Sequence, residues 1–327
     1  MKLSMIRGNK DFPVWFKMVT QLALILTAGL FSISASAATI QQKTFDSPEK
    51  AVQALVDSIK KDDKASLKAI LGPKSKPLLS SGDPVADRYD LKRFVDAYDK
   101  SQRLDRKGKE KALLVIGTND WPFPIPLVMK NNRWRFDTVA GGEEIMNRRI
   151  GRNELGTIQT SLAIIDAQRE YATSNRGSNG LPEYAARLIS DPGKKNGLYW
   201  ESREGEPPSP LGELVAKAKA EGYDKKMGKN KAPAPYQGYL YRILTAQGES
   251  ANGGAYDYRV KGHLIGGIAV VAYPARYGSS GIMTFIVNHD GLVYQKNLGR
   301  KTVEIASKME LYNPGPGWTK VETPASK

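Results

Sequence analysis

The chain between Tyr236 and Gly299 contains, in order, the apolar-alternating runs YLYRILTA (239–246), YDYRV (256–260), GIAVVAYP (267–274), GIMTFIVN (281–288) and LVYQKN (292–297). Alternation of apolar and polar residues is typical of β-strands with one buried face. The runs are separated by residues that accept positive φ and close hairpins: 251–254 (ANGG), 261–262 (KG), 278–281 (GSSG) and 290–291 (DG). The sequence therefore predicts an antiparallel meander, which by itself names no reaction.

A helix is predicted upstream of the meander. Leu155, Ile158, Leu162 and Ile165 are spaced three and four apart, as on the buried face of an amphipathic helix that runs to about Ser174. The charged segment 141–153 before it is interpreted as a connector. Residues 154–312 are therefore assigned to one α+β domain and residues 313–327 to a tail.

The order of one helix, a long loop and a meander resembles the globular part of type IV pilins and pseudopilins over about residues 154–300. The phrase IIDAQREYAT (164–173) is similar to the end of pilin helices. In pilins, however, the helix continues upstream as an apolar segment that sits in the membrane. The corresponding place here holds Glu143, Glu144, Arg148, Arg149 and Arg152, and each charge costs a few kcal/mol in hydrocarbon. Filament assembly by the pilin route is therefore not expected.

The N-terminal half opens with three predicted helices, 48–60, 64–71 and about 84–101. Ser47 is a good N-cap before Pro48 at the first helical position, and Gly72 stops the second helix. Predicted strands follow at 112–118, 125–130 and 134–139, with a tight turn at Asn131-Asn132. Helices followed by a curled antiparallel sheet resemble the cone-shaped nuclear-transport-factor-2-like (NTF2-like) fold, here over residues 42–140. The predicted fold class is thus α+β with two domains.

The N-terminus has the order of residues of a secretory signal. Lys2, Arg7, Lys10 and Lys17 precede an apolar run from 18 to 31, and the small residues 35–37 (ASA) follow it. The run is shorter than the roughly 20 residues that span a bilayer, which favours cleavage after Ala37 over an uncleaved anchor. The sequence predicts a signal peptide over 1–37 and an exported protein, periplasmic or secreted, that contacts membrane only before cleavage.

Charge and cysteine content restrict the function classes. The chain has a formal net charge of +15, and removal of 1–37 would leave +12. This balance favours an anionic envelope polymer or an envelope protein as the partner. Nucleic acid is not expected, because the chain is predicted to be exported and has no basic helix or aromatic-basic signature. With no cysteine, disulfides and thiolate chemistry are excluded. The basic clusters 103–111 and 225–231 are interpreted as solvated loops and hairpin ends.

Several longer phrases resemble one bacterial family of exported proteins, designated as a domain of unknown function, DUF2950. They are NDWPFPIPLV (119–128), WRFDT (134–138), EEIMNRRIGRNEL (143–155), DAQREYA (166–172), GLYW (197–200), GEPPSPLG (205–212), PYQGYLYRILTAQG (235–248) and MTFIVNHDG (283–291). The resemblance runs from about Phe45 to Tyr312. It implies an envelope protein of unassigned activity and supplies no catalytic residue.

Aromatic residues in loops and at strand starts are the candidate binding residues. They are Trp121, Phe123, Tyr199, Trp200 and Tyr236. Trp and Tyr combine a large apolar face with a polar handle, which suits recognition at a wet surface. The alternative is that these rings only cover the ends of sheets.

The sequence supports catalysis less strongly than it supports binding. The two histidines, His263 and His289, have no second ligand at metal spacing, so neither a metal nor any other cofactor is expected. His289 beside Asp290 could act as a general base, but a hairpin turn explains it better. Paired carboxylates among Glu201, Glu204 and Glu206 could serve a glycosidase.

The sequence therefore favours a soluble, non-enzymatic envelope protein that binds an anionic surface or a partner protein. One alternative is an envelope glycan hydrolase that uses the loop carboxylates. A second alternative is an accessory of a pilus or secretion apparatus.

Overall fold

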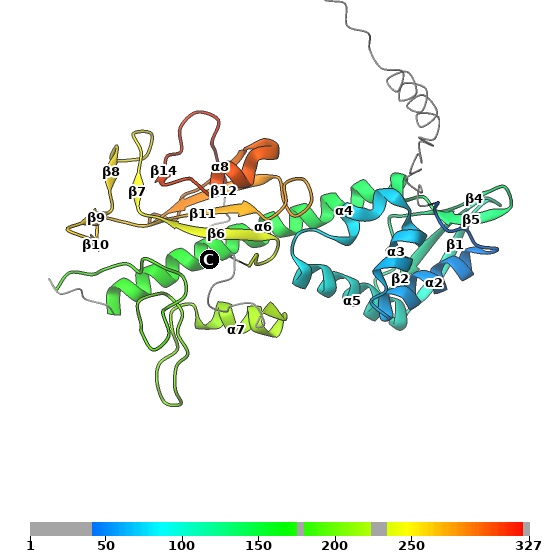
Figure 1. Cartoon of the computed structure of the whole chain (residues 1–327), viewed down its shortest axis with the longest axis horizontal. Helices are drawn as coiled ribbons and strands as arrows, with labels where there is room; N and C mark the ends of the chain where they lie inside the picture. The colour runs from blue at the N-terminus through cyan, green and yellow to red at the C-terminus, as the bar shows by residue number, and fades with distance from the viewer. Residues whose placement is uncertain (1–40, 175–179, 224–233, 323–327) are drawn as a thin grey trace, which may run out of the picture. The chain divides into compact units, whose positions relative to one another are not determined.

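The computed structural model describes residues 41–174, 180–223 and 234–322 (Figure 1). The described residues belong to one compact unit. The predicted signal peptide and the basic cluster 225–231 lie outside the described residues. Within the described ranges, none of the helices combines the length and hydropathy that spanning a bilayer requires. The fold is mixed α and β, with seven described α-helices and mainly antiparallel sheets.

The first four helices are α2 (Pro48–Lys60), α3 (Lys64–Leu71), the short α4 (Lys76–Leu79) and α5 (Pro84–Lys100), with a 3-10 turn η2 (Pro73–Ser75) between α3 and α4. Three of these four helices are close to those predicted, and the short α4 was not predicted. The Ser47 side chain accepts a hydrogen bond from the amide of Lys50 at 3.2 Å, so the predicted cap is confirmed. Gly72 ends α3 with φ of 81°, a conformation that favours glycine.

The N-terminal sheet has the strand order β1-β2-β4-β5, and β3 pairs with β2 beside this path. Its strands are β1 (Gln102–Lys107), β2 (Lys111–Ile116), β3 (Trp121–Pro122), β4 (Leu127–Lys130) and β5 (Arg133–Phe136), all antiparallel. Asn131 and Asn132 have φ of 52° and 56°, which confirms the predicted turn. The basic cluster 103–111 forms the exposed end of the β1–β2 hairpin, as the interpretation as a solvated loop or hairpin end expected, and the charges of β1 suit a solvated edge strand.

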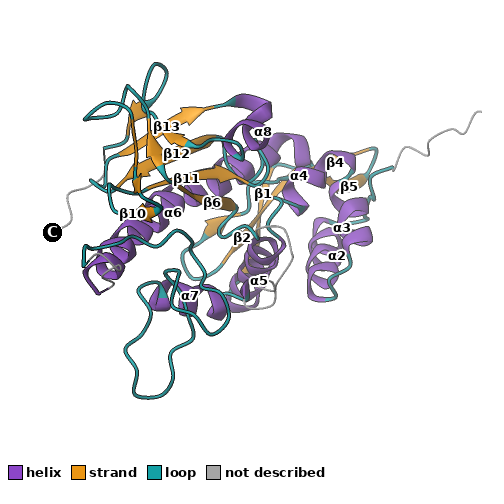
Figure 2. Cartoon of the chain, turned by 60° about the vertical axis from the view of Figure 1, so that its left-hand side comes forward, coloured by secondary structure: helices purple, strands orange, loops and turns teal. Residues whose placement is uncertain are grey.

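A first hydrophobic core lies between this sheet and the helices packed against it. α2 and α3 contact β5, and α5 contacts β1 and β2 (Figure 2). The largest fully buried side chains of this core come from α2, α3, the sheet and the segment between β3 and β4: Leu55, Leu67, Ile70, Leu114, Ile116, Ile125, Leu127 and Phe136. The sheet therefore supplies the partner surface that the three amphipathic helices require.

The predicted connector is not a connector. One helix, α6 (Thr138–Ser174), contains 37 residues and includes the whole charged segment 141–153 (Figure 1). The carboxylate of Asp137 accepts a hydrogen bond from the amide of Ala140 at 3.2 Å at its start. Its C-terminal half contacts β11 and β12 of the second sheet, and its N-terminal half contacts α4.

Contacts along α6 explain why four glycines and several charges do not interrupt it. A Cβ at Gly141 would lie 2.2 Å from the carbonyl oxygen of Pro124, so only glycine allows this approach to the first sheet. Arg149 donates to the carbonyl oxygens of Pro77 at 2.9 Å and Leu78 at 2.5 Å. Tertiary contacts thus override a weak local preference for helix.

The C-terminal sheet is the predicted meander with one strand removed from it. Its order is β15-β13-β12-β11-β6, all antiparallel (Figure 2). The strands are β6 (Tyr239–Leu244), β11 (Ala269–Pro274), β12 (Met283–Asn288), β13 (Val293–Asn297) and β15 (Thr319–Lys320). All six residues of β11 are buried, because the strand is central and α6 and α8 (Thr302–Ala306) both contact it. Part of the predicted tail, 319–320, is therefore the edge strand of this sheet.

The run 256–260 was wrongly placed in the meander. It is divided by Tyr258, which is fully buried, into β8 (Tyr256–Asp257) and β9 (Arg259–Val260). β8 pairs with β7 (Ala246–Gln247), whose other neighbour is the parallel strand β14 (Leu311–Tyr312). β9 pairs with β10 (His263–Leu264) across the predicted Lys261-Gly262 turn. The remaining described elements are α7 (Gly212–Ala220) and the 3-10 turn η4 (Gly299–Lys301).

A buried carboxylate ties the N-terminal helices to the C-terminal sheet. Asp83 caps α5 by accepting from the amides of Val85 at 3.0 Å and Ala86 at 3.1 Å. Its other oxygen accepts from the hydroxyl of Tyr223 at 2.8 Å and the amide of Gly238 at 2.9 Å. Burial raises the pKa of Tyr223, so its hydroxyl remains a donor to Asp83.

Two glycines of α6 provide a matched pair for testing how the helix is packed. Gly141→Ala is expected to lower the free energy of unfolding by about 1–3 kcal/mol, because the added Cβ meets backbone atoms of Pro124 and Ile125. Gly151→Ala adds a Cβ in open space and is expected to raise it by about 0.5–1 kcal/mol. Urea unfolding followed by circular dichroism measures both, and equal effects would contradict the packing described here.

Two aspartate caps provide a second pair. Asp83→Asn is expected to lower the free energy of unfolding by about 2 kcal/mol, because Asn has only one accepting oxygen and cannot satisfy the donors that face both oxygens of Asp83. Asp63→Asn is expected to change it by less than about 0.5 kcal/mol, because Asn and Asp cap helices equally well. Thermal unfolding compares the variants, and a neutral Asp83→Asn would show that the junction does not depend on this carboxylate.

Candidate functional site

A cavity of about 700 Å³ lies in the N-terminal half, between α5, the first sheet and the N-terminal part of α6. Its volume is in the range of small-molecule binding pockets, roughly 300–1,000 Å³. α2, α3 and α4 also contribute lining residues, among them Leu55, Leu67 and Leu78. Of the residues of α5, only Val85 at its start is buried. The side chains that α5 contributes toward the first core are half-buried, and space remains beside them.

The floor of the cavity is apolar. Leu55, Ile116, Phe123 and Ile125 line it and are all buried. Phe123 lies 5.1 Å from Phe94 of α5, measured between ring centroids at a tilt of 60°. Buried aliphatic and aromatic walls favour a ligand with an apolar body, because water in such a space finds few hydrogen-bond partners.

The mouth of the cavity is charged. α6 contributes Arg148 and Arg152, and both side chains are about half exposed. The Arg148 guanidinium lies 5.7 Å from the centroid of the Trp121 ring and pairs with Glu144 at 2.6 Å. Arg152 pairs with Asp90 of α5 at 2.6 Å, which links the two helices across the mouth.

A third arginine at the cavity has a structural part. Arg149 is buried, and its guanidinium is held by the carbonyl oxygens at α4 described above. Burial lowers the pKa of Arg149, and the nearby carboxylate of Asp87 opposes that shift. Arg149 therefore fixes α6 against α4 and positions Arg148 and Arg152 at the mouth.

Two of the five sequence-predicted binding residues belong to this cavity. Trp121 and Phe123 both line it, with ring centroids 6.1 Å apart. Phe123 is buried in the first core, whereas Trp121 is partly exposed at the mouth below Arg148. The prolines of NDWPFPIP leave only the short β3 in this segment, which frees both rings to face α5 and α6.

The other three predicted binding residues lie elsewhere. Tyr199 and Trp200 pack on the second core, where the Tyr199 hydroxyl accepts from Lys219 at 2.8 Å and Trp200 lies 6.4 Å from the ring of Tyr171. Tyr236 contacts Tyr223 in a small third cluster, with ring centroids 5.1 Å apart, and burial raises its pKa to about 12. The five rings are thus not gathered at one place.

The residues considered for catalysis are dispersed. Glu201 is exposed and lies 3.6 Å from Lys219, and Glu206 pairs with Lys195 at 3.3 Å. That hydrogen bond from Lys195 lowers the pKa of Glu206, the opposite of what a general acid requires. His263 contacts Glu183 at 3.1 Å, and His289 packs edge-on against Tyr258 at 5.8 Å. The described residues contain no group of three or more potential metal ligands.

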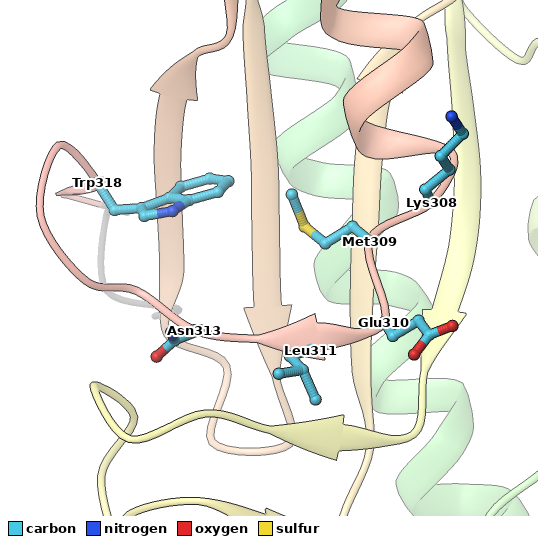
Figure 3. A pocket seen from close by; sticks show the side chains of 6 residues that line it. All are labelled: Lys308, Met309, Glu310, Leu311, Asn313 and Trp318. Atoms are coloured by element: carbon cyan, nitrogen blue, oxygen red, sulfur yellow. The ribbon is translucent and has the colours of Figure 1, made fainter.

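A second, smaller pocket of about 390 Å³ lies beside β14, outside the first core (Figure 3). In Figure 3 the Met309 side chain extends toward the Trp318 ring, whereas Lys308 and Glu310 point away from it. Lys296 lies 6.0 Å from the centroid of the Trp318 ring. Both Met309 and Trp318 pack on the second core, so this recess is a depression in its surface rather than an enclosed cavity.

The arginines of the mouth were not among the sequence-predicted site residues, because 141–153 was interpreted as a connector. A helical reading of the segment places Ile145, Arg148 and Arg152 on one face, since residues three and four apart are neighbours on a helix. Phe94 lies in the third predicted helix, but a position in a predicted helix does not distinguish core packing from a cavity wall.

Comparison with known proteins gives a family but no activity. No curated protein and no solved structure matches the chain. A family model described as "Protein of unknown function (DUF2950)" matches residues 42–321, which is nearly all of the chain beyond the predicted signal peptide. The cavity and both cores lie within the matched residues. The chain therefore belongs to the DUF2950 family of proteins of unknown function.

Proposed function

We propose that this protein is an exported, non-enzymatic binding protein of the cell envelope, and that the cavity between α5, the first sheet and α6 is its ligand site. The observation that carries the proposal is an apolar-floored space of about 700 Å³ whose mouth bears arginines of α6. Empty space between apolar side chains lowers the stability of the folded protein. A ligand that fills this space restores the missing contacts and stabilises the folded state by binding to it. Trp121 and Phe123 are the binding residues of this site.

Export and an anionic partner belong to the same proposal. Export rests on the order of basic, apolar and small residues in 1–37, and it makes the protein periplasmic or secreted. The formal charge of +12 that remains after removal of 1–37 supports an anionic partner, whether an envelope polymer or an envelope protein. Tyr199, Trp200 and Tyr236 are candidates for such a contact at surfaces away from the cavity.

Two fold resemblances support a binding protein. Helices α2, α3 and α5 over the sheet β1–β5, with a cavity between them, are what an NTF2-like domain would have. The C-terminal half of α6 against an antiparallel sheet is what a pilin-like domain would have. Because the N-terminal half of α6 packs on the first core through Gly141 and Arg149, it is not available to assemble a filament core. An accessory role in a pilus or secretion apparatus therefore ranks below ligand binding.

The glycan-hydrolase alternative has less support. It needs two carboxyl groups on either side of a bond, one of them kept protonated. Glu201 and Glu206 are instead paired with lysines at the surface, and the pKa of Glu206 is lowered. No observation on the described residues favours this alternative.

Cleavage of the signal is directly testable. When the gene is expressed in a bacterial host, N-terminal sequencing of the exported protein is expected to begin at Ala38. A protein that retains residues 1–37, or that stays in the cytoplasm, would contradict the proposed export.

Binding in the cavity is tested with an uncharged apolar fluorophore, N-phenyl-1-naphthylamine. Wild-type protein is expected to raise its fluorescence to saturation with one site. Ile145→Trp fills the cavity from α6 and is expected to weaken binding at least about tenfold, or about 1.4 kcal/mol. Leu155→Trp is the matched control, because Leu155 lies on the same helix but is 69% exposed and does not line the cavity.

Absence of saturable binding by the wild type would refute the proposed site. Equal loss of binding in both tryptophan variants would show that the fluorophore binds elsewhere. Circular dichroism of each variant verifies that α6 is retained.

A further inference from the structure

The charges around the cavity are unevenly distributed. Its lining contains five cationic side chains, Arg93, Lys100, Arg148, Arg149 and Arg152, but only two carboxylates, Asp90 and Asp96. With the exception of Arg149, these cationic residues are exposed, whereas the floor is buried and apolar. The cavity is thus apolar at its base and positively charged at its opening.

Both lining carboxylates already have cationic partners. Asp90 pairs with Arg152, and Asp96 pairs with Lys92 of α5, each at 2.6 Å. Neither carboxylate is therefore free to repel an incoming anion strongly. The excess of positive charge at the opening remains.

Arg148 is the side chain best placed to meet a ligand at the opening. Its guanidinium lies over Trp121, which holds it at the mouth by a cation–π contact. Its partner, Glu144, is half exposed, so this ion pair is screened by water and is weak. A planar guanidinium can exchange that partner for a carboxylate or phosphate, which it binds in bidentate fashion.

We propose that the ligand of this cavity is an amphiphile with one apolar chain and an anionic head group, with the chain against Phe94 and Phe123 and the head group at Arg148. This inference rests on the proposed function of the cavity as a ligand site. The floor has no surplus hydrogen-bonding groups for a polar body, which excludes a free sugar or a polyanion from the interior. A wholly uncharged hydrocarbon would leave the cationic mouth unused.

The test is displacement of N-phenyl-1-naphthylamine from the purified full chain by compounds of equal chain length. Dodecanoate and dodecyl phosphate are the anionic probes, and 1-dodecanol is the uncharged one. Each anion is expected to displace the fluorophore at a concentration roughly tenfold lower than the alcohol, the size of one charge-assisted hydrogen bond. The two anions distinguish a carboxylate head group from a phosphate.

Two substitutions at the mouth are expected to change the affinity for dodecanoate in opposite directions. Arg148→Gln is expected to weaken dodecanoate roughly tenfold and leave 1-dodecanol unchanged. Glu144→Gln removes the competing carboxylate and is expected to strengthen dodecanoate severalfold. A merely structural role for Arg148 would not produce this opposite pair. Arg300→Gln, at an exposed site in η4, is the control and is expected to change neither probe.

The outcomes separate this inference from the proposed function. If the alcohol binds as tightly as the two anions, or if Arg148→Gln weakens all three alike, the anionic head group is refuted while the cavity remains a ligand site. If neither the fluorophore nor any probe binds, the proposed function itself fails.

Discussion

The structure depends on one unbroken helix. α6 contains 37 residues, about 55 Å at the usual rise of 1.5 Å per residue, and both hydrophobic cores pack against it. Its first half is fixed by the close approach of Gly141 to the backbone of Pro124 and by the hydrogen bonds of Arg149. At its middle, Asn153 donates to the carbonyl oxygen of Ser280 at 2.9 Å, and Glu154 accepts from the amide of Met283 at 3.0 Å. The helix is therefore hydrogen-bonded to α4 and to the second sheet within a few turns.

This arrangement also explains the candidate site. Because α6 is straight through the charged segment, Ile145, Arg148 and Arg152 come to lie over the space between α5 and the first sheet. The same turn that holds the two cores together thus supplies the charged mouth of the cavity. A flexible connector at this place would leave the apolar floor open to water on that side.

Much of the local structure could be predicted from the sequence. The Ser47 cap, the end of α3 at Gly72 and the Asn131-Asn132 turn depend on backbone preferences that single residues express, and each was confirmed. The alternating runs gave four of the five strands of the second sheet, β6, β11, β12 and β13, because alternation reports one buried face.

What failed depends on contacts between distant residues. The segment 141–153 carries glycines and charges that disfavour a helix by themselves, and only its partners at Pro124 and Pro77 make the helix stable. The run 256–260 alternates like a strand of the meander. Tyr258 in its middle is nevertheless fully buried, and its hydroxyl donates to Gln247 at 2.9 Å, so the run does not pair with that sheet. The cavity could not be predicted, since an aromatic residue of a helix such as Phe94 looks the same in the sequence whether it closes a core or lines a space.

The measurement that tests this account most directly is a crystal structure of the protein with dodecanoate. The account predicts the chain of the ligand in the cavity against Phe94 and Phe123, with its carboxylate within hydrogen-bonding distance of the Arg148 guanidinium. A structure in which α5 packs onto β2 with no space between them, and dodecanoate lies elsewhere or is absent, would contradict it.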